Sequence, residues 1–307
     1  MDFKHIPVLF NEAIDALNIK PNGIYVDCTG GGGGHSAAIA EKIPAGRLIT
    51  IDRDPQAAGI LRERLHHFNN VTVVHDNFIN LKAILAEYAC EQVDGILADL
   101  GVSSHQLDTA ERGFSYHYDS PLDMRMSLDG TSAADLVNTL PQNALQKIIY
   151  DYGEERYASA IARGIVRARE IKPVETTFEL VEIIKAAIPA AARREGGHPA
   201  RRTFQALRIE VNRELDNLSA SIDIMFQSLK PGGRLAIITF HSLEDRIVKK
   251  SFASLTEGCD CPPQFPVCVC GKEPKGRLPF KAKKPSDLQI EQNPRCRSAR
   301  LRAIEKI

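Results

Sequence analysis

Five consecutive glycines, residues 30–34, constrain this 307-residue chain more than any other feature of its sequence. A short apolar run at 24–26 and then Asp27 precede them, and residues 35–41 follow with helical spacing. We therefore predict a strand, a glycine loop and a helix in that order. Such a loop lets the backbone approach a ligand without an intervening Cβ, and the helix start offers free N–H groups. A flexible turn that binds nothing is the alternative.

Apolar strands and helical segments alternate around this unit, which predicts an α/β fold. Strands are predicted at 47–52, 71–74, 93–99, 234–240 and 298–305, with 278–283 as hairpin partner of the last. Helices are predicted at 7–17, 55–68, 81–88, 202–229 and 242–255. Ser242 and Asp245 are the predicted N-cap pair of the last of these helices.

With the strand before the glycine loop counted as the first, an acidic residue ends the second strand (47–52) and the fourth (93–99). Asp52 follows Gly30 by 22 residues, near the spacing expected between a nucleotide-binding glycine loop and the carboxylate that holds a ribose. Asp99 ends the fourth strand, which lies beside the ligand at the switch point of such a sheet. A surface acid is the alternative for Asp52. Phe78, after the third strand, is either the edge of an adenine site or an ordinary core residue.

The glycine pattern excludes two common nucleotide sites. The dinucleotide fingerprint G-x-G-x-x-G fails because its last position is His35 or Ser36, and G-x-x-x-x-G-K-[ST] does not occur. The run does satisfy D-x-x-G-x-G-x-G from Asp27. A strand-end acid, a glycine loop and a ribose acid resemble the S-adenosylmethionine-dependent methyltransferases. Their ligand has no pyrophosphate, so the third close-packing glycine is not required.

The alternation stops between residues 107 and 205, where helices alone are predicted. They lie at 132–138, 141–150, 154–172 and 177–187, the last beginning at Thr176 or Thr177 with Glu179 or Glu182 downstream. We predict a methyltransferase domain made of residues 1–106 and 206–307, interrupted by a helical substrate-recognition insertion at 107–205. The formal net charge is zero, so attraction of RNA must rest on local patches. Four arginines favour a phosphate-rich substrate over a solvated loop: Arg193, Arg194, Arg201 and Arg202.

Seven cysteines at uneven spacing indicate reduced thiols rather than a disulfide framework. Four of them form two C-x-C pairs, Cys259 with Cys261 and Cys268 with Cys270. Four sulfurs suit structural zinc, but the usual spacing is C-x₂₋₄-C. Zinc and free thiols both stay open, and no metal ligand is assigned. With no membrane-length apolar run and no signal-peptide pattern, we expect a cytoplasmic protein without a membrane partner.

Short motifs of one family occur along nearly the whole chain, including the insertion. They are G-G-H-S at 33–36, A-D-L-G-V-S-S at 98–104, E-R-G-F-S at 111–115, P-L-D-M-R-M at 121–126, Y-G-E-E-R at 152–156, T-F-Q-A-L-R at 203–208, F-H-S-L-E-D-R at 240–246 and N-P-R at 293–295. In these motifs the chain resembles the RsmH (MraW) family of bacterial 16S ribosomal RNA (cytosine-N4)-methyltransferases. It departs from the family pattern in its unbroken glycines and in Cys296, where an alanine is expected.

The resemblance implies a class I methyltransferase with a Rossmann-like sheet and an inserted all-helical domain. It implies methyl transfer from S-adenosylmethionine to the exocyclic N4 of one cytidine in 16S rRNA, at the decoding centre of the small subunit. A homodimer is a further option, and whether naked rRNA or an assembled particle is the substrate stays open. The cofactor contacts that it implies are Gly33, Gly34, His35, Asp52, Phe78, Asp99 and Gln106.

Catalysis at an exocyclic amino group calls for a hydrogen-bond acceptor, because the nitrogen lone pair is delocalised into the ring. We assign this role to Asp99, with Ser103, Ser104 and His241 as alternatives, since no D/N-P-P-Y motif follows the fourth strand. The target base must leave its stack to react. Arg125, Tyr116 and Phe114 are candidates for clamping or stacking on it, with core packing the alternative for Phe114.

Two other functional classes compete with a methyltransferase. A nicotinamide oxidoreductase would share the sheet and Asp52, but it requires the missing third glycine. A non-catalytic RNA-binding module or assembly factor would use the same basic patches. It would not need the glycine loop, Asp52 and Asp99 in this order.

Overall fold

The structure is a computed structural model that describes residues 7–194, 197–259, 261, 264–265, 267 and 270–307. The chain forms two compact units, one of Met1–Gly101 with Leu215–Ile307 and the other of Val102–Glu214. The first unit is thus assembled from both ends of the chain. The predicted boundaries at 106/107 and 205/206 lie five and nine residues from the boundaries of these two units.

The first unit is built on a seven-stranded sheet with the order β3-β2-β1-β4-β5-β7-β6. All pairs are parallel except those of β7, which runs antiparallel to β5 and β6. The order reverses between β1 and β4, and this confirms the predicted class I methyltransferase sheet. The strands are β1 Ile24–Asp27, β2 Arg47–Asp52, β3 Val71–His75, β4 Val93–Asp99, β5 Leu229–Thr239, β6 Gly276–Arg277 and β7 Arg300–Lys306.

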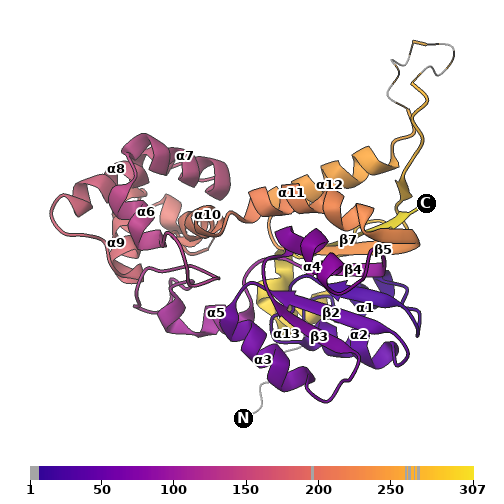
Figure 1. Cartoon of the computed structure of the whole chain (residues 1–307). Helices are drawn as coiled ribbons and strands as arrows, with labels where there is room; N and C mark the ends of the chain where they lie inside the picture. The colour runs from indigo at the N-terminus through magenta and orange to yellow at the C-terminus, as the bar shows by residue number, and fades with distance from the viewer. Residues whose placement is uncertain (1–6, 195–196, 260, 262–263, 266, 268–269) are drawn as a thin grey trace. The chain divides into compact units, whose positions relative to one another are not determined.

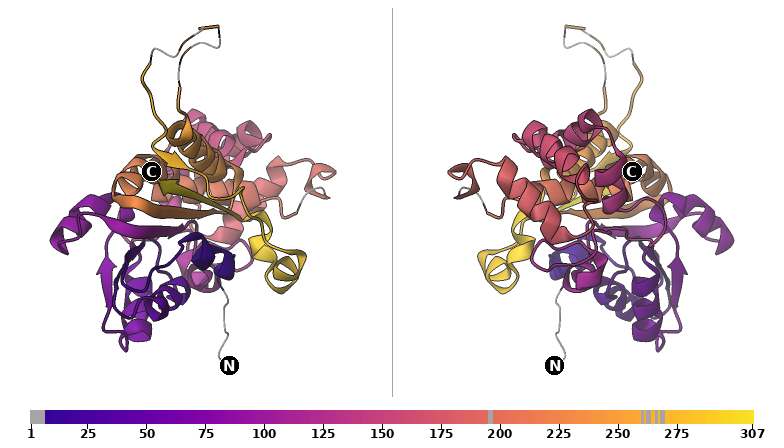
Figure 2. Two further views of the ribbon diagram at one scale, coloured as in Figure 1. Left: turned by 90° about the vertical axis from the view of Figure 1, so that its right-hand side faces the viewer. Right: turned by 90° about the vertical axis from the view of Figure 1, so that its left-hand side faces the viewer.

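Helices cover both faces of this sheet, as Figures 1 and 2 show. One face packs against α4 Leu81–Glu87, α11 Glu214–Gln227 and α12 Ser242–Thr256, and the other against α1 Phe10–Ala16 and α2 Gly34–Lys42. Alternate strand residues enter opposite cores because successive side chains point to opposite faces. Val26, Ile96 and Leu235 belong to the first core, and Tyr25, Leu97 and Ala236 to the second. The unit also contains α3 Pro55–Leu65, α13 Asp287–Gln292 and the 3₁₀ turns η1 Phe78–Asn80 and η4 Pro294–Ser298.

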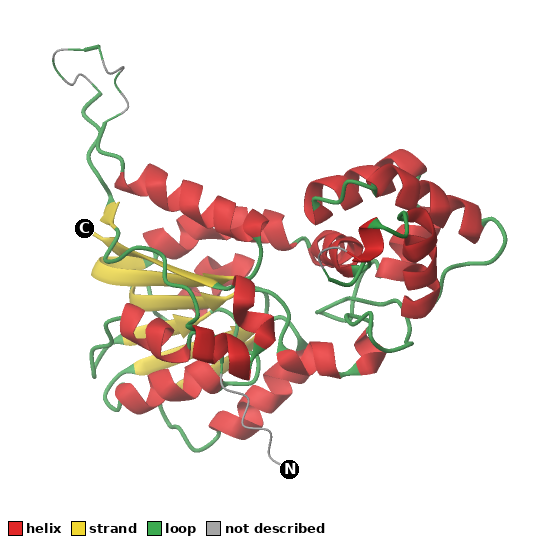
Figure 3. Ribbon diagram, turned by 180° about the vertical axis from the view of Figure 1, so that it is seen from behind, coloured by secondary structure: helices red, strands yellow, loops and turns green. Residues whose placement is uncertain are grey.

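The second unit contains helices and loops, and Figure 3 shows no strand among its described residues. Apolar residues four apart supply its core, such as Ile161 with Ile165 and Leu180 with Ile184. Thr176 and Glu179 form the capping box that starts α9, one of the predicted pairs. The helices are α5 Ser104–Asp108, α6 Ala133–Thr139, α7 Gln142–Gly153, α8 Ala158–Arg169, α9 Thr177–Ala187 and α10 Arg201–Asn212, with η2 Ala110–Arg112 and η3 Ala192–Arg194.

Three local predictions are wrong. The helix predicted over 202–229 is two helices, because Arg213 has a left-handed backbone (φ 50°) that ends α10. The N-cap of α12 is His241 with Glu244 rather than Ser242 with Asp245, since Asp245 forms an ion pair with Arg302 on β7. The hairpin partner of β7 is Gly276–Arg277, and the predicted segment 278–283 adds one bridge at its last residue.

Among the described residues, no helix is both long and apolar enough to cross a membrane.

Substitutions of two glycines, Gly95 and Gly59, test how closely the first unit is packed. A Cβ on Gly95 in β4 would lie 2.8 Å from Cε1 of Tyr25, whose side chain is 1% exposed and has no room to retreat. We expect Gly95→Ala to lower the free energy of unfolding by about 1–3 kcal/mol through overpacking. The matched change Gly59→Ala meets no atom within 4 Å on α3, so it should raise stability by about 0.5–1 kcal/mol. Urea midpoints compare the two, and equal midpoints would contradict this packing.

Candidate active site

Three carboxylates meet at the carboxyl edge of the sheet because β1, β2 and β4 are adjacent and parallel. Asp27, Asp52 and Asp99 are the last residues of these strands. The glycine loop leaves β1 at the same edge and leads into α2. The structure therefore brings the predicted loop, the predicted ribose acid and the predicted catalytic acid to one place.

The glycines of the loop are required for different reasons. Gly33 has φ 76° and stands at the N-cap of α2, where a side chain would be strained. A Cβ on Gly30 would lie 2.5 Å from Oγ1 of Thr50, and one on Gly34 would lie 2.4 Å from Cγ of Pro7. A Cβ on Gly32 would have no neighbour within 4 Å. Gly30 and Gly34 thus serve close packing within the protein, while the backbone at Gly32 is open to a ligand.

Asp52 ties the glycine loop to the end of β2. Its Oδ2 accepts a hydrogen bond from the backbone N–H of Gly31 at 2.7 Å, and its Oδ1 accepts one from Asp54 at 2.8 Å. Burial raises the pKa of its carboxyl, and these two hydrogen bonds oppose that shift by favouring the charged form. Both oxygens keep further lone pairs, so Asp52 can still accept hydrogen bonds from a diol. Its contact with a ribose stays a prediction.

Asp27 is a functional candidate that the sequence reasoning left out of the site. It is 1% exposed, accepts a hydrogen bond from Oγ of Ser36 at 2.6 Å and accepts another from the backbone of Thr29 at 3.1 Å. Burial raises the pKa of Asp27 to about 6, against the effect of these donors. Its place as the acid of D-x-x-G-x-G-x-G was the available signal. Asp27 holds the first turn of α2 and the start of the loop.

Asp99 faces His35 across the site. Nδ1 of His35 lies 3.6 Å from Oδ2 of Asp99, and burial lowers the pKa of His35 to about 4, so the imidazole is neutral near pH 7. Burial and the charges of Asp27 and Glu244 raise the pKa of Asp99 well above its ordinary value. Oδ1 of Asp99 and Nε2 of His35 are buried and form no hydrogen bond with any residue that the structure describes. These two atoms, and Nε2 of His241, thus lack, among the described residues, the hydrogen-bond partners that buried polar groups normally have.

His241, a predicted alternative acceptor, uses its Nδ1 atom to cap a helix. That nitrogen accepts a hydrogen bond from the backbone of Glu244 at 3.4 Å and caps α12. In return, Oε2 of Glu244 accepts hydrogen bonds from the backbone of His241 at 3.3 Å and of Phe240 at 2.8 Å. Glu244 is 2% exposed and its charge acts on Asp99, yet the sequence reasoning missed it. The H-x-x-E spacing at the end of β5 was its signal.

Phe78 follows the carboxyl end of β3 and starts η1. Its side chain is half-buried and packs against the core beneath α4. This contact supports the core interpretation, and the remaining exposed part leaves an edge for a ring. Contact with an adenine stays a prediction.

The other predicted residues lie in the second unit. Ser103 and Gln106 cap α5 mutually: Oγ of Ser103 accepts from the backbone of Gln106 at 3.2 Å, and Oε1 of Gln106 accepts from the backbone of Ser103 at 2.9 Å. Arg125 is held by Asp123, with its Nη2 donating to Oδ2 at 2.6 Å. Phe114 is 6% exposed and belongs to the helical core. Their roles toward cofactor and RNA stay predictions.

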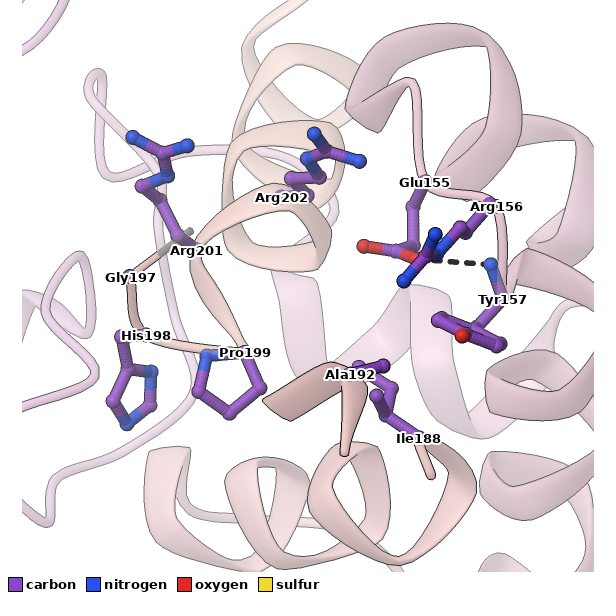
Figure 4. Close-up of a pocket in the computed structure, with 10 residues that line it drawn as sticks. All are labelled: Glu155, Arg156, Tyr157, Ile188, Ala192, Gly197, His198, Pro199, Arg201 and Arg202. Atoms are coloured by element: carbon purple, nitrogen blue, oxygen red, sulfur yellow. Dashed lines mark hydrogen bonds between the residues drawn. The ribbon is translucent and has the colours of Figure 1, made fainter. Parts of the chain in front are cut away.

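A pocket of about 230 Å³ opens in the second unit, and two of the predicted arginines line it (Figure 4). Arg201 and Arg202 stand in the first turn of α10, and Arg156 faces them beside the ring of Tyr157, 4.8 Å from its centroid. Glu155 is 5% exposed and accepts a hydrogen bond from the backbone of Tyr157 at 2.9 Å. The pocket thus combines three exposed guanidinium groups with one buried carboxylate.

An aromatic stack neighbours this pocket through His198, which is one of its lining residues. The ring of Tyr116 stacks on His198 with 4.5 Å between centroids and meets Phe204 edge-on at 5.6 Å. Tyr116 is therefore engaged within the unit. Arg193 is exposed on η3, while the side chain of Arg194 is outside the described part of the structure.

Comparisons with a family model and with named proteins point to the same family. The model of the MraW methylase family matches residues 2–307. A protein of Lachnospira eligens named "Ribosomal RNA small subunit methyltransferase H" is 56% identical, with 100% of this chain and 99% of that protein aligned. A protein of Heliobacterium modesticaldum with the same name is 53% identical, with 100% of both aligned. An rRNA methylase structure from Streptococcus thermophilus shares 13% identity at a TM-score of 0.42, covering 97% of this chain and 93% of that one. The strand order, rather than this structural likeness, defines the fold.

The raised pKa of Asp27 predicts a pH dependence of stability. Between its ordinary pKa of 3.8 and its folded value of about 6, the folded state binds more protons than the unfolded state. The free energy of unfolding must then fall as pH rises through this window, by about 3 kcal/mol for a shift of roughly two units. Asp27→Asn should remove this contribution in urea titrations between pH 4 and pH 7.

The control is Ser36→Ala, which deletes a donor that lowers the pKa of Asp27. Its fall in stability should extend to higher pH. Identical pH profiles for the wild type and Asp27→Asn would show that Asp27 does not titrate in this range.

Proposed function

The chain belongs to the MraW methylase family, and from that premise we propose that it is an S-adenosylmethionine-dependent methyltransferase of small-subunit ribosomal RNA. The observation that carries the proposal is the meeting of the glycine loop, Asp52 and Asp99 at one sheet edge. It occurs in a chain 56% identical to a protein named for that activity. We further propose that the acceptor is the exocyclic N4 of one cytidine of 16S rRNA at the decoding centre.

The residues at the sheet edge fit S-adenosylmethionine. The buried Oδ1 of Asp99 and Nε2 of His35 are polar atoms without partners among the described residues, as a site for a polar ligand requires. The open backbone at Gly32 admits a ligand against the loop. We assign Asp52 to the ribose hydroxyls, Phe78 to the adenine, and Gly33, Gly34 and His35 to the methionine portion, with Gln106 as a further contact.

When bound, S-adenosylmethionine supplies an electrophilic methyl group on a positively charged sulfur. Asp99 contributes to the reaction in two ways. As a carboxylate it accepts a hydrogen bond from the cytosine amino group, which favours a pyramidal nitrogen with an available lone pair. Its raised pKa also makes that carboxylate a stronger base for the proton that N4 must release after methylation. A cationic ligand beside it favours the ionised form that both roles need.

Two of the alternative acceptors are engaged at one atom each, and the side chain of Ser104 lies outside the described part of the structure. Nδ1 of His241 caps α12, and Oγ of Ser103 caps α5. Oδ1 of Asp99 has no hydrogen-bond partner among the described residues. Nε2 of His241 is also without one. We favour Asp99 because a carboxylate accepts charge-assisted hydrogen bonds, which are the stronger ones. We assign most of the remaining catalytic effect to positioning N4 in line with the methyl group.

We assign RNA binding to the second unit. Arg201 and Arg202 offer exposed guanidinium groups in the first turn of α10, which suits phosphate. The matching relatives align over the helical unit as well as the sheet, so both units belong to the proposed activity. We propose that the enzyme acts in the cytoplasm on 16S rRNA, with Arg125 and Arg193 as further contacts.

The deciding experiment identifies the methylated atom. The purified chain is incubated with methyl-labelled S-adenosylmethionine and either small ribosomal subunits or naked 16S rRNA from a strain lacking this enzyme. We expect label in N4-methylcytidine after digestion and mass spectrometry. Label in another nucleoside would overturn the N4 assignment, and no label with either substrate would overturn the proposed activity.

Two isosteric variants separate catalysis from cofactor binding within that assay. Asp99→Asn should lower turnover by about 10²–10⁴-fold, because its amide is neither a base nor a charged acceptor. Asp52→Asn should instead weaken cofactor binding by about 1.5–3 kcal/mol, roughly 10–150-fold, with turnover restored at saturating cofactor. Turnover by Asp99→Asn that is also restored by excess cofactor would make Asp99 a binding residue only.

The salt dependence of RNA binding tests the arginine pocket. Arg201→Ala with Arg202→Ala removes two proposed phosphate contacts, so the slope of log K against log salt should decrease by about 1.4 for single-stranded RNA. The control is Arg163→Ala with Arg167→Ala, which deletes the same charge from exposed positions on α8. Equal slopes for the two double variants would remove the pocket from the RNA interface.

A further inference from the structure

The described residues of the segment between α12 and β6 form no core of their own. Between Glu257 and Lys275 none of the described residues is buried, and none belongs to a helix or strand. The segment is closed at its base, where the backbone of Lys275 donates to the carbonyl of Leu255 at 2.9 Å. Figure 1 shows its described parts projecting beyond the end of α12. Hydrophobic packing therefore contributes little to the conformation of these described residues.

Three cysteines converge within this segment. The Sγ atoms of Cys259, Cys261 and Cys270 all lie within 4.8 Å of one another. Those of Cys259 and Cys270 are 3.8 Å apart, although eleven residues separate them in the chain. The backbone N–H of Cys261 donates to Sγ of Cys259 at 3.4 Å. Cys268, the fourth cysteine of the two C-x-C pairs, lies outside the described residues.

These distances match a metal–thiolate site. A tetrahedral zinc with Zn–S bonds of about 2.3 Å holds its sulfurs about 3.8 Å apart, which is the spacing of Cys259 and Cys270. A covalent disulfide would bring two sulfurs to about 2.05 Å. The 3.8 Å between Sγ of Cys259 and Sγ of Cys270 therefore excludes a covalent bond between these two atoms. An N–H group directed at Sγ also stabilises a thiolate, the form that binds metal.

We propose that Cys259, Cys261 and Cys270 bind a structural zinc ion that staples the segment between α12 and β6. The close sequence spacing of C-x-C, which left the sequence analysis undecided, is accommodated because Cys270 approaches Cys259 across the loop. The ion draws together residues from both ends of the segment. Binding requires deprotonated thiols and therefore releases protons.

Metal analysis of the full chain tests this site. Protein purified without chelators and analysed by mass spectrometry of its metals should hold about one zinc per chain. Cys259→Ser with Cys270→Ser should lose that zinc. Cys296→Ala is the matched control, since it removes a thiol from η4, outside the segment, and should leave the zinc in place. Zinc retained by the double variant, or lost equally by the control, overturns the site.

A second measurement uses the wild-type chain, so that the test does not depend on a variant that fails to fold. A mercurial thiol reagent releases zinc from the wild-type chain, and a chromogenic chelator measures the amount released. In a separate assay, trypsin cleavage after Lys272 is followed in the presence of zinc and after removal of zinc by EDTA. We expect release to depend on thiol modification and cleavage to accelerate without zinc. Equal cleavage rates overturn the staple. Two further outcomes would overturn the proposal. One is zinc-free protein whose mass is two units lower per cysteine pair, which would show a disulfide. The other is zinc-free protein in which all thiols react.

Discussion

The crowding of three carboxylates at one end of a parallel sheet is the constraint on which the first unit depends. Asp27, Asp52 and Asp99 each end a strand, and each has a pKa raised by burial. Removing acids from water costs stability unless donors meet them. The glycine loop and α2 supply many of these donors, through the N–H of Gly31 and the hydroxyl of Ser36. The carboxyl of Asp99, the group proposed to react, has the fewest donors, so its desolvation cost is the least offset.

The glycine loop is therefore a packing solution as well as a ligand site. Gly30 lets Thr50 and Leu61 approach, and Gly34 lets Pro7 close over the start of α2. These contacts hold the loop in the arrangement in which the N–H of Gly31 donates to Asp52. A rigid loop loses less conformational entropy when a ligand binds, which is the physical advantage of preorganisation.

Sequence reasoning reached most of the fold because strong periodicity marks its elements. The strand-end acids were found since strand ends, glycine runs and spacing are all local properties. Glu244 was missed because its importance comes from reaching Asp99 across two neighbouring strands, and only pairing of β4 with β5 brings those ends together. The break at Arg213 was missed for a related reason, since a lone left-handed arginine has no local signal and tertiary packing overrides its preference.

The sequence by itself determined the class of this protein: the strand–glycine loop–helix unit, the acids that follow it, the helical insertion and the family motifs are all written in residue order. Only the tertiary structure decided which atoms are available for chemistry. It engaged Nδ1 of His241 and Oγ of Ser103 in helix caps, and it left Oδ1 of Asp99 and Nε2 of His241 without a described hydrogen-bond partner. It also brought Cys270 to Cys259. Spacing along a chain limits which residues can meet, but hydrogen-bond partners and sulfur distances arise only when distant segments pack together.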